Sequence, residues 1–365
     1  MTLGVYELKL ARRAHLGGRQ ATRISTLAIL VALALFSVLF ILADVSPWSA
    51  YAEIARYAFF NTFGLPLTIS RFIFLLLCTY AFIIPYRAGL WNIGMTGQLY
   101  MGSLAAFGVA LALGAKQGGA VHPALATTLL VLAAMAGGAA YAAVAGFLRG
   151  RFNINEIVVT MIMNFSAFWL VSFMIKEGGP FTGGGGEGEG FPLPTAFTGP
   201  LVAGVPYTLF VALVLAVALS FMLNKTRLGY EIRAFGKNPA AAQYAGVDPF
   251  RISMIVFLIG GALAGLAGYH YFAAVPGVYR IPKSYGYFGD LAFYGIICGL
   301  ISLGNPLAAI PVSFLFGGLS IGGRFVQGKF HMNFGVDYAL LGVLMIVLVG
   351  FQFFYRYEIV WRKKE

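Results

Sequence analysis

The stretch ISTLAILVALALFSVLFILA, from Ile24 to Ala43, contains no charged residue. About 20 apolar residues are needed to cross the ~30 Å hydrocarbon core of a bilayer as a helix, and this stretch has that length. A cleaved secretory signal has a shorter apolar core and a small-residue cleavage site, which Ala43-Asp44 does not provide. We therefore interpret the stretch as a retained first membrane span, preceded by a basic leader with Lys9, Arg12, Arg13, Arg19 and Arg23.

The composition of the whole chain agrees with a membrane protein. Of 365 residues, 59% are hydrophobic and 10% are charged, whereas soluble domains carry about 25% charged residues. The uncharged stretch from Leu291 to Gly323 is too long for one span, and Gly304-Asn305-Pro306 divides it because proline disfavours helix continuation. We therefore predict an all-α polytopic protein of about ten transmembrane helices, with the other spans near 24–43, 67–86, 91–113, 122–148, 156–175, 207–223, 252–275 and 336–355.

The distribution of basic residues predicts the orientation. If the N-terminus is inside and the chain crosses ten times, 17 of the 25 Lys and Arg residues fall on the inner side. This bias predicts that both termini are cytoplasmic, as expected for a multi-pass protein of the bacterial inner membrane. The predicted parts are a basic N-terminus over 1–23, one transmembrane domain over 24–355 and a C-terminal tail over 356–365. The positive-inside bias accounts for the net charge of +12, so membrane lipid is expected as a partner and nucleic acid is not.

The sequence offers no constellation for catalysis, metal binding or cofactor binding. Cys78 and Cys298 lie within predicted spans, where packing is the simpler role. The segment GRFVQGKF (Gly323 to Phe330) mimics a phosphate-binding loop, but Phe330 stands where a Ser or Thr must bind Mg²⁺. We therefore predict a transport protein that hydrolyses no ATP itself.

Two connections are longer than turns require. The first, 176–206, contains ten Gly and five Pro and is predicted to be a flexible outer loop. The second, 224–251, is predicted to be cytoplasmic. In it Asn238 is a favoured N-cap, Pro239 suits the first helical position, and Gly246 suits the left-handed position after a helix. These residues predict a short helix that starts at Pro239 and continues through the good helix formers Ala240 to Ala245. We expect it to dock into another part of this chain or into a partner; the alternative is an ordinary surface helix that joins two spans.

Four segments resemble the ABC-importer permeases that serve branched-chain amino acids, ribose and nucleosides. RAGLWNIGMTGQ, beginning at Arg87, resembles the nucleoside-permease signature RAGLFNIGAEGQ, and RFNINEIVVTMIMNF, beginning at Arg151, resembles FGVNEVISTLMLNY. TRLGYEIRAFGKNPAAAQYAGV, beginning at Thr226, resembles TRLGFELRAVGLNPRAARYAGI, and the region from Gly286 to Gly323 resembles GYGFDGIAVALLGRLNPLG. The similarity covers roughly residues 60 to 355 and is closest to purine nucleoside permeases.

The resemblance implies an inverted-repeat transmembrane subunit and a set of partners. These are a second permease subunit, expected to form a heterodimer, a cytoplasmic ABC ATPase that holds ATP and Mg²⁺, and an extracytoplasmic substrate-binding lipoprotein. The short cytoplasmic helix then becomes the coupling helix, with the ATPase-coupling residues Asn238, Pro239, Ala240, Ala241, Ala242, Tyr244, Ala245 and Gly246.

Polar residues within the spans are candidates for the substrate pathway, because facing lipid would be costly. Asn92, Thr96 and Gln98, with Gly94, lie where a span begins or is locally broken. Their amides either hydrogen-bond a polar solute or satisfy backbone groups at an irregular helix start, and membership of the family motif favours the pathway.

A second polar set comprises Asn155, Glu156 and Asn164. Glu156 lies near a helix N-terminus, where its charge is favoured, and near Arg149, so a structural role is at least as well supported as substrate contact. Asp290, near the outer end of its span, is either a gate residue or an interfacial acid.

Thr96 stands where the family often has Glu, which leaves the solute open. A purine nucleoside is the leading hypothesis, and riboflavin or a sugar is the alternative. A self-sufficient secondary transporter would need paired ionisable residues at mid-membrane, and a membrane enzyme would need a His or carboxylate constellation. The sequence indicates neither.

Overall fold

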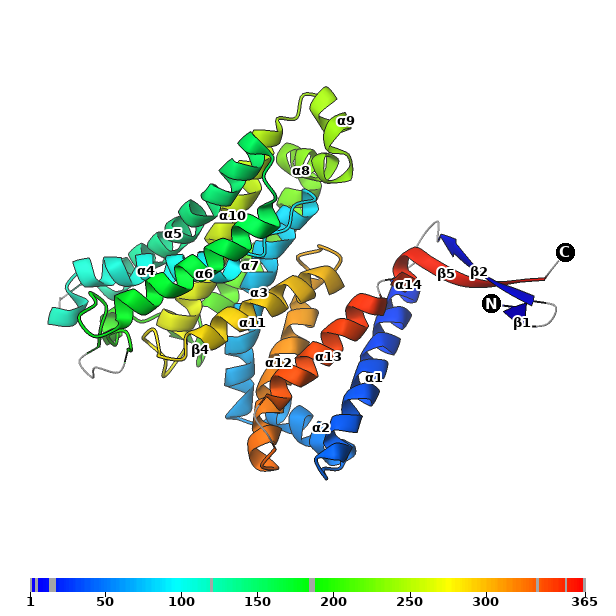
Figure 1. Ribbon diagram of the computed structural model, residues 1–365. Helices are drawn as coiled ribbons and strands as arrows, with labels where there is room; N and C mark the ends of the chain where they lie inside the picture. The colour runs from blue at the N-terminus through cyan, green and yellow to red at the C-terminus, as the bar shows by residue number, and fades with distance from the viewer. Residues whose placement is uncertain are drawn as a thin grey trace. The chain divides into compact units, whose positions relative to one another are not determined.

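The computed structural model describes residues 2–3, 6–12, 18–118, 121–183, 188–332, 335–351 and 353–363. Arg13, the run Gly184 to Gly186 and Lys364, which entered the sequence predictions, lie outside these ranges. The described chain is predominantly helical (Figure 1) and forms two units. We call residues 66–317 the central unit, and residues 1–65 with 318–365 the terminal unit.

The central unit holds most of the predicted spans. Between α7 and α10 the chain forms two short helices, and α10 runs on into a π-helical turn from His270 to Ala274. A two-stranded hairpin, β3 (Leu201–Val202) with β4 (Val205–Pro206), lies in the predicted outer loop. The helices are α3 (Gly64–Arg87), α4 (Met95–Ala112), α5 (Pro123–Phe152), α6 (Glu156–Ile175), α7 (Thr208–Lys225), α8 (Arg227–Lys237), α9 (Pro239–Tyr244), α10 (Pro249–Tyr269), α11 (Gly286–Ile301) and the start of α12 (Ala309–Lys329).

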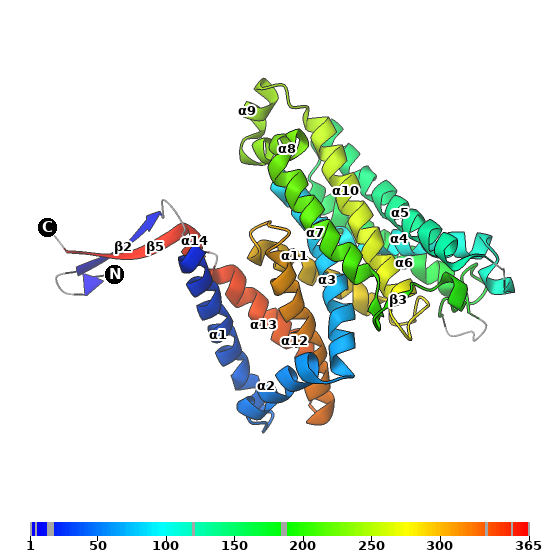
Figure 2. The same ribbon diagram turned by 180° about the vertical axis from the view of Figure 1, so that it is seen from behind.

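Small residues hold the centre of this unit together. Helices α4, α5 and α10 lie side by side (Figure 2), and glycines occupy their closest approaches. A Cβ atom on Gly265 would overlap the carbonyl oxygen of Ala134, and one on Gly138 would overlap that of Gly261. Membrane helices associate through such small residues, since lipid supplies no hydrophobic driving force between them.

The terminal unit contains the remaining spans and the two chain ends. Its helices are α1 (Gly18–Leu42), α2 (Pro47–Ala55), α13 (Val336–Phe351) and α14 (Phe353–Arg356), together with the end of α12. Within the unit, Lys329 Nζ lies 2.8 Å from Glu53 Oε1. An antiparallel sheet of β1 (Thr2–Leu3), β2 (Tyr6–Arg12) and β5 (Tyr357–Lys363) pairs the two ends of the chain. The sequence interpretation, which was all-α, did not predict this sheet.

The predicted apolar runs correspond to helices, although not all of them are long enough to span a membrane. Among the described residues, seven helices are long and apolar enough to cross, and α1 with the helical segment from Pro47 to Phe60, bent by 116°, makes an eighth candidate. Helices α11 and α13, at 16 residues each, are shorter. The predicted division at Gly304 is confirmed, since Leu303 and Gly304 have positive φ between α11 and α12. The number of crossings, the inverted repeat and the cytoplasmic termini stay predictions.

Candidate functional site

An irregular segment between α3 and α4 is fixed by a pair of buried amides. Asn92 Nδ2 donates to Gln98 Oε1 at 2.9 Å, and Gln98 Nε2 donates to Asn92 Oδ1 at 2.8 Å. Asn92 Oδ1 also accepts from the backbone N–H of Gly94 at 3.2 Å. The two side chains are buried and satisfy each other, so in this conformation they shape the start of α4 instead of facing a solute.

Helix α6 is joined to the same segment through Asn164. Asn164 Oδ1 accepts from the N–H of Gly97 at 2.8 Å, and its Nδ2 donates to the carbonyl of Ile93 at 2.9 Å. Gly94 allows the close approach, because a Cβ there would lie 2.8 Å from Cβ of Thr160. One amide therefore bridges two backbone groups on either side of the α4 start.

Glu156 has a structural setting at the beginning of α6. Its Oε1 accepts from the N–H of Trp91 at 3.2 Å, and its Oε2 lies 3.4 Å from Nε of Arg149. Asn155 is the N-cap of α6, with Oδ1 accepting from the N–H of Ile157 at 2.9 Å. The charge of Glu156 is thus balanced by a cation and a helix N-terminus.

A cavity of about 450 Å³ opens between α4, α6 and α11. Thr96 lies at its wall and donates from Oγ1 to the carbonyl of Gly289 at 2.9 Å. Asp290 also lines the cavity, and its carboxylate has no hydrogen bond or ion pair with the residues that the structure describes. The other lining residues are predominantly aromatic: Tyr100, Met161, Asn164, Phe165, Phe168, Trp169, Gly286, Gly289 and Phe293.

This lining suits a small solute with a planar or apolar face and polar edges. Aromatic rings stack on such faces, while a few placed polar groups fix orientation. Asp290 is exposed and is the one carboxylate among the described residues that line the cavity.

The segment from 224 to 251 folds as two capped helices. Thr226 Oγ1 accepts from the N–H of Gly229 at 3.1 Å at the start of α8, and Asn238 Oδ1 accepts from the N–H of Ala241 at 3.1 Å at the start of α9. Gly246 has φ +86°, as predicted for the position after the helix. The predicted capped helix is confirmed, although it ends at Tyr244; the separate helix α8 was not predicted.

Comparison with known proteins identifies the family. The family model described as branched-chain amino acid transport system, permease component, matches residues 64–349. The chain belongs to this permease family. It is therefore a multi-pass membrane protein and a transport subunit, not an enzyme.

Three relatives of the permease span most of its length. The glucose ABC transporter permease protein TsgB13 of Haloferax volcanii is 31% identical over 97% of this chain and 93% of its own. The guanosine ABC transporter permease protein NupP of Bacillus subtilis is 29% identical over 89% of this chain and 91% of its own. The guanosine ABC transporter permease protein NupQ of the same organism is 25% identical over 63% of this chain and 72% of its own.

The permease structure separates the predicted pathway residues into two groups. Thr96, Asn164 and Asp290 line the aromatic cavity. The remaining five residues, Asn92, Gly94, Gln98, Asn155 and Glu156, do not line it; they build the α3–α4 segment and the start of α6 beside it.

Two features of the permease escaped the sequence interpretation. One is the aromatic lining of the cavity. The sequence does not reveal it, because an aromatic ring in a membrane helix can face either lipid or a pathway.

The other is Arg71 in the predicted span 67–86. Its side chain is 5% exposed and lies 5.2 to 5.9 Å from the ring centres of Tyr271, Tyr287 and Phe288. Its Nη1 has no hydrogen-bond partner within the described part of the chain. A lone Arg inside an apolar run was the available signal.

Proposed function

We propose that this permease is the transmembrane subunit of an ATP-driven ABC importer and forms half of the translocation pathway for a small polar solute, a purine nucleoside. The observation that carries the proposal is the cavity in which Asp290 faces a wall of aromatic rings. The rings offer stacking partners for a base, and the carboxylate offers an acceptor for its N–H groups or for ribose hydroxyls.

The relatives support two solute classes. Two are named as guanosine permeases, which supports a nucleoside, and one is named as a glucose permease, which supports a sugar as the second candidate. The cavity is compatible with both classes, because aromatic faces also pack on the apolar face of a sugar ring.

Helix α9 supports the coupling role. It is rigidly capped, and Tyr244 projects from it with 95% of its surface exposed, while Ala242 is buried on the other side. An exposed aromatic side chain on a short capped helix is a suitable anchor for a partner protein. In this proposal the partner is the cytoplasmic ATPase that holds ATP and Mg²⁺, and the permease residues from Asn238 to Gly246 transmit its movement.

The proposed assembly contains two further proteins. The presence of two guanosine permease proteins in one organism supports a second, different permease subunit. An extracytoplasmic binding lipoprotein would deliver the solute. The positive-inside bias supports a bacterial inner-membrane location with both termini cytoplasmic and ten crossings, α11 and α13 included.

The pathway role is tested by Asp290→Asn in the full importer, with radiolabelled guanosine and glucose as the transported solutes. Hydrogen bonds to a charged group contribute about 1.5–3 kcal/mol, so we expect uptake at low solute concentration to fall about tenfold or more. The matched control is Glu177→Gln, which changes an exposed acid in the predicted outer loop and should leave uptake unchanged.

Equal uptake in both variants would remove Asp290 from the pathway. Accumulation of glucose without guanosine would assign the permease to sugars, and accumulation of neither, in a complex with intact ATPase activity, would contradict both solute classes.

A further inference from the structure

A second cavity, of about 670 Å³, lies at the end of α3 beside α8. Two glycines bring the backbones together beside it: a Cβ on Gly236 would overlap the carbonyl oxygen of Arg87, and one on Gly89 would lie 3.3 Å from Cα of Gly236. Gly89 has φ +73°, which favours glycine there in any case. This contact places Arg233 and Lys237, on either side of Gly236 in α8, next to Arg87.

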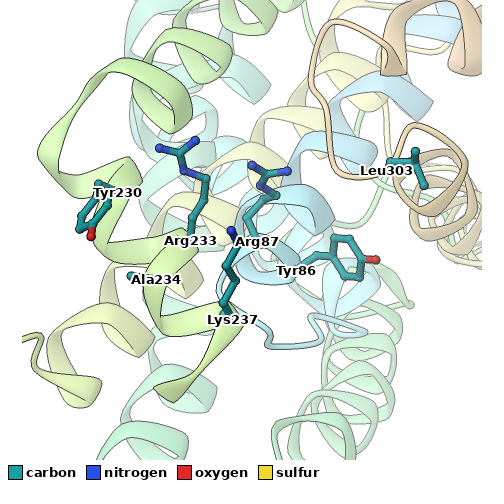
Figure 3. Close-up of a pocket in the computed structure, with 8 residues that line it drawn as sticks. Tyr86, Arg87, Tyr230, Arg233, Ala234, Lys237 and Leu303 are labelled. Atoms are coloured by element: carbon teal, nitrogen blue, oxygen red, sulfur yellow. The ribbon is translucent and has the colours of Figure 1, made fainter. Parts of the chain in front are cut away.

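Three cations therefore share one cavity. Figure 3 shows Arg87, Arg233 and Lys237 extending their charged ends toward the same region. Arg233 is oriented by neutral acceptors, the carbonyl of Gly229 at 3.3 Å and Asn224 Oδ1 at 3.5 Å, which leave its charge uncompensated.

None of the described residues that line this cavity carries a carboxylate. Glu231, the acid on α8, lines the groove between α8 and α9 instead and is already paired, with its oxygens 2.9 Å from Nε of Arg227 and 3.7 Å from Nη1 of Arg251. Like charges held together without a counter-ion repel each other, and an anion bound between them relieves that repulsion. The cavity has the charge of an anion site.

The position of the cavity indicates where the anion comes from. Arg87 is the last residue of the apolar helix α3, and Leu303 follows the end of α11, so the cavity lies at the level where apolar helices end. Tyr86 and Tyr230 complete the lining. Tyrosine with an apolar neighbour is typical of the membrane interface, and basic pockets at this level bind anionic headgroups.

We infer that the cavity formed by Arg87, Arg233 and Lys237 binds the phosphate of an anionic phospholipid headgroup. With both termini cytoplasmic, this headgroup belongs to a lipid of the inner leaflet. Only that assignment to a leaflet rests on the orientation given under the proposed function. The site adjoins the groove that α9 lines, because Tyr230 and Ala234 border both cavities. A lipid bound there would steady α8, from which α9 continues.

The test measures lipid retention by the full-length permease in detergent, using native mass spectrometry with added phosphatidylglycerol or phosphatidylcholine. We expect selective retention of phosphatidylglycerol, with about a fivefold loss of affinity for Arg233→Gln and again for Lys237→Gln. The matched control is Lys225→Gln, which removes an exposed cation at the end of α7 outside the cavity and should leave retention unchanged.

The outcomes separate the possible occupants. Equal retention in all three variants, each monodisperse by size exclusion, would overturn the inference. Displacement of phosphatidylglycerol by millimolar inorganic phosphate or ATP would identify a soluble phosphate as the occupant and contradict the lipid. Weakened ATPase association by the Arg233 and Lys237 variants, with unchanged lipid retention, would assign the cations to the ATPase. Because no transport is measured, failure of the proposed solute pathway leaves this result unaffected.

Discussion

Asp290 and Glu156 are both acids in helices of the central unit, and their surroundings differ. Glu156 is 7% exposed. It accepts a hydrogen bond from the N–H of Trp91 in the α3–α4 segment and forms an ion pair with Arg149. Asp290 lines a cavity without a partner among the described residues. The buried charge of Glu156, with its partners in place, supports the fold, whereas the exposed carboxylate of Asp290 is free to accept a hydrogen bond from a solute or from water.

The buried amide pair should be important for stability. Asn92→Leu leaves Gln98 buried without its partner, and Gln98→Leu does the same to Asn92, so each change should cost about 1–3 kcal/mol. The double variant should cost less than the sum of the two, because no stranded amide of the pair remains. The midpoint of thermal unfolding in detergent measures this effect.

Gln117→Leu serves as the control, because Gln117 is an exposed amide outside the pair. Strict additivity of the two single changes would show that the amides do not act as a pair.

Among the elements, α8 and α9 differ in what they expose. Helix α8 buries Ile232 and Phe235 against the central unit. Helix α9 buries only Ala242 among its described residues and presents Ala241 and Tyr244 outward. A bulky residue at Ala242 would therefore disturb the packing of α9 itself, whereas changes at Ala241 or Tyr244 probe what α9 binds.

We expect Tyr244→Ala and Ala241→Trp to weaken association of the ATPase about tenfold or more, because the first removes an aromatic anchor and the second obstructs close contact. Affinity is measured by titrating the ATPase onto the reconstituted permease. Leu201→Ala, which truncates an apolar side chain exposed by 47% in β3, is the control. Undiminished association in both α9 variants would exclude α9 as the coupling helix.

At the scale of the whole molecule, the orientation of the chain in the membrane can be tested by labelling single introduced cysteines. This is possible because the two natural cysteines, Cys78 and Cys298, are both fully buried. The natural protein should therefore resist a membrane-impermeant maleimide. In spheroplasts, we expect Thr195→Cys, in the predicted outer loop, to react from outside. Tyr244→Cys should react only after the membrane is disrupted. The reverse labelling pattern would show that the topology is the opposite of the one predicted. The unsubstituted protein gives the background level of labelling.

Local features of the sequence determined much of this molecule. Runs of apolar residues predicted the helices, since crossing a bilayer requires a length that each run shows by itself. Asn238, Pro239 and Gly246 predicted the limits of α9 closely, because caps act over one helical turn. The family motifs, spread from Arg87 to Gly323, indicated a permease without any knowledge of packing.

Tertiary structure decided what the polar residues do. Thr96, Asn164 and Asp290 come from three helices, and no local pattern reveals that they meet at one aromatic cavity. Asn92 and Gln98 are polar residues of the kind expected along a substrate pathway, but their side chains hydrogen-bond to each other. Arg87 joins Arg233 and Lys237 only because glycines let two distant backbones touch. Such contacts depend on how the helices pack, and the packing is set by residues that are far apart in the sequence.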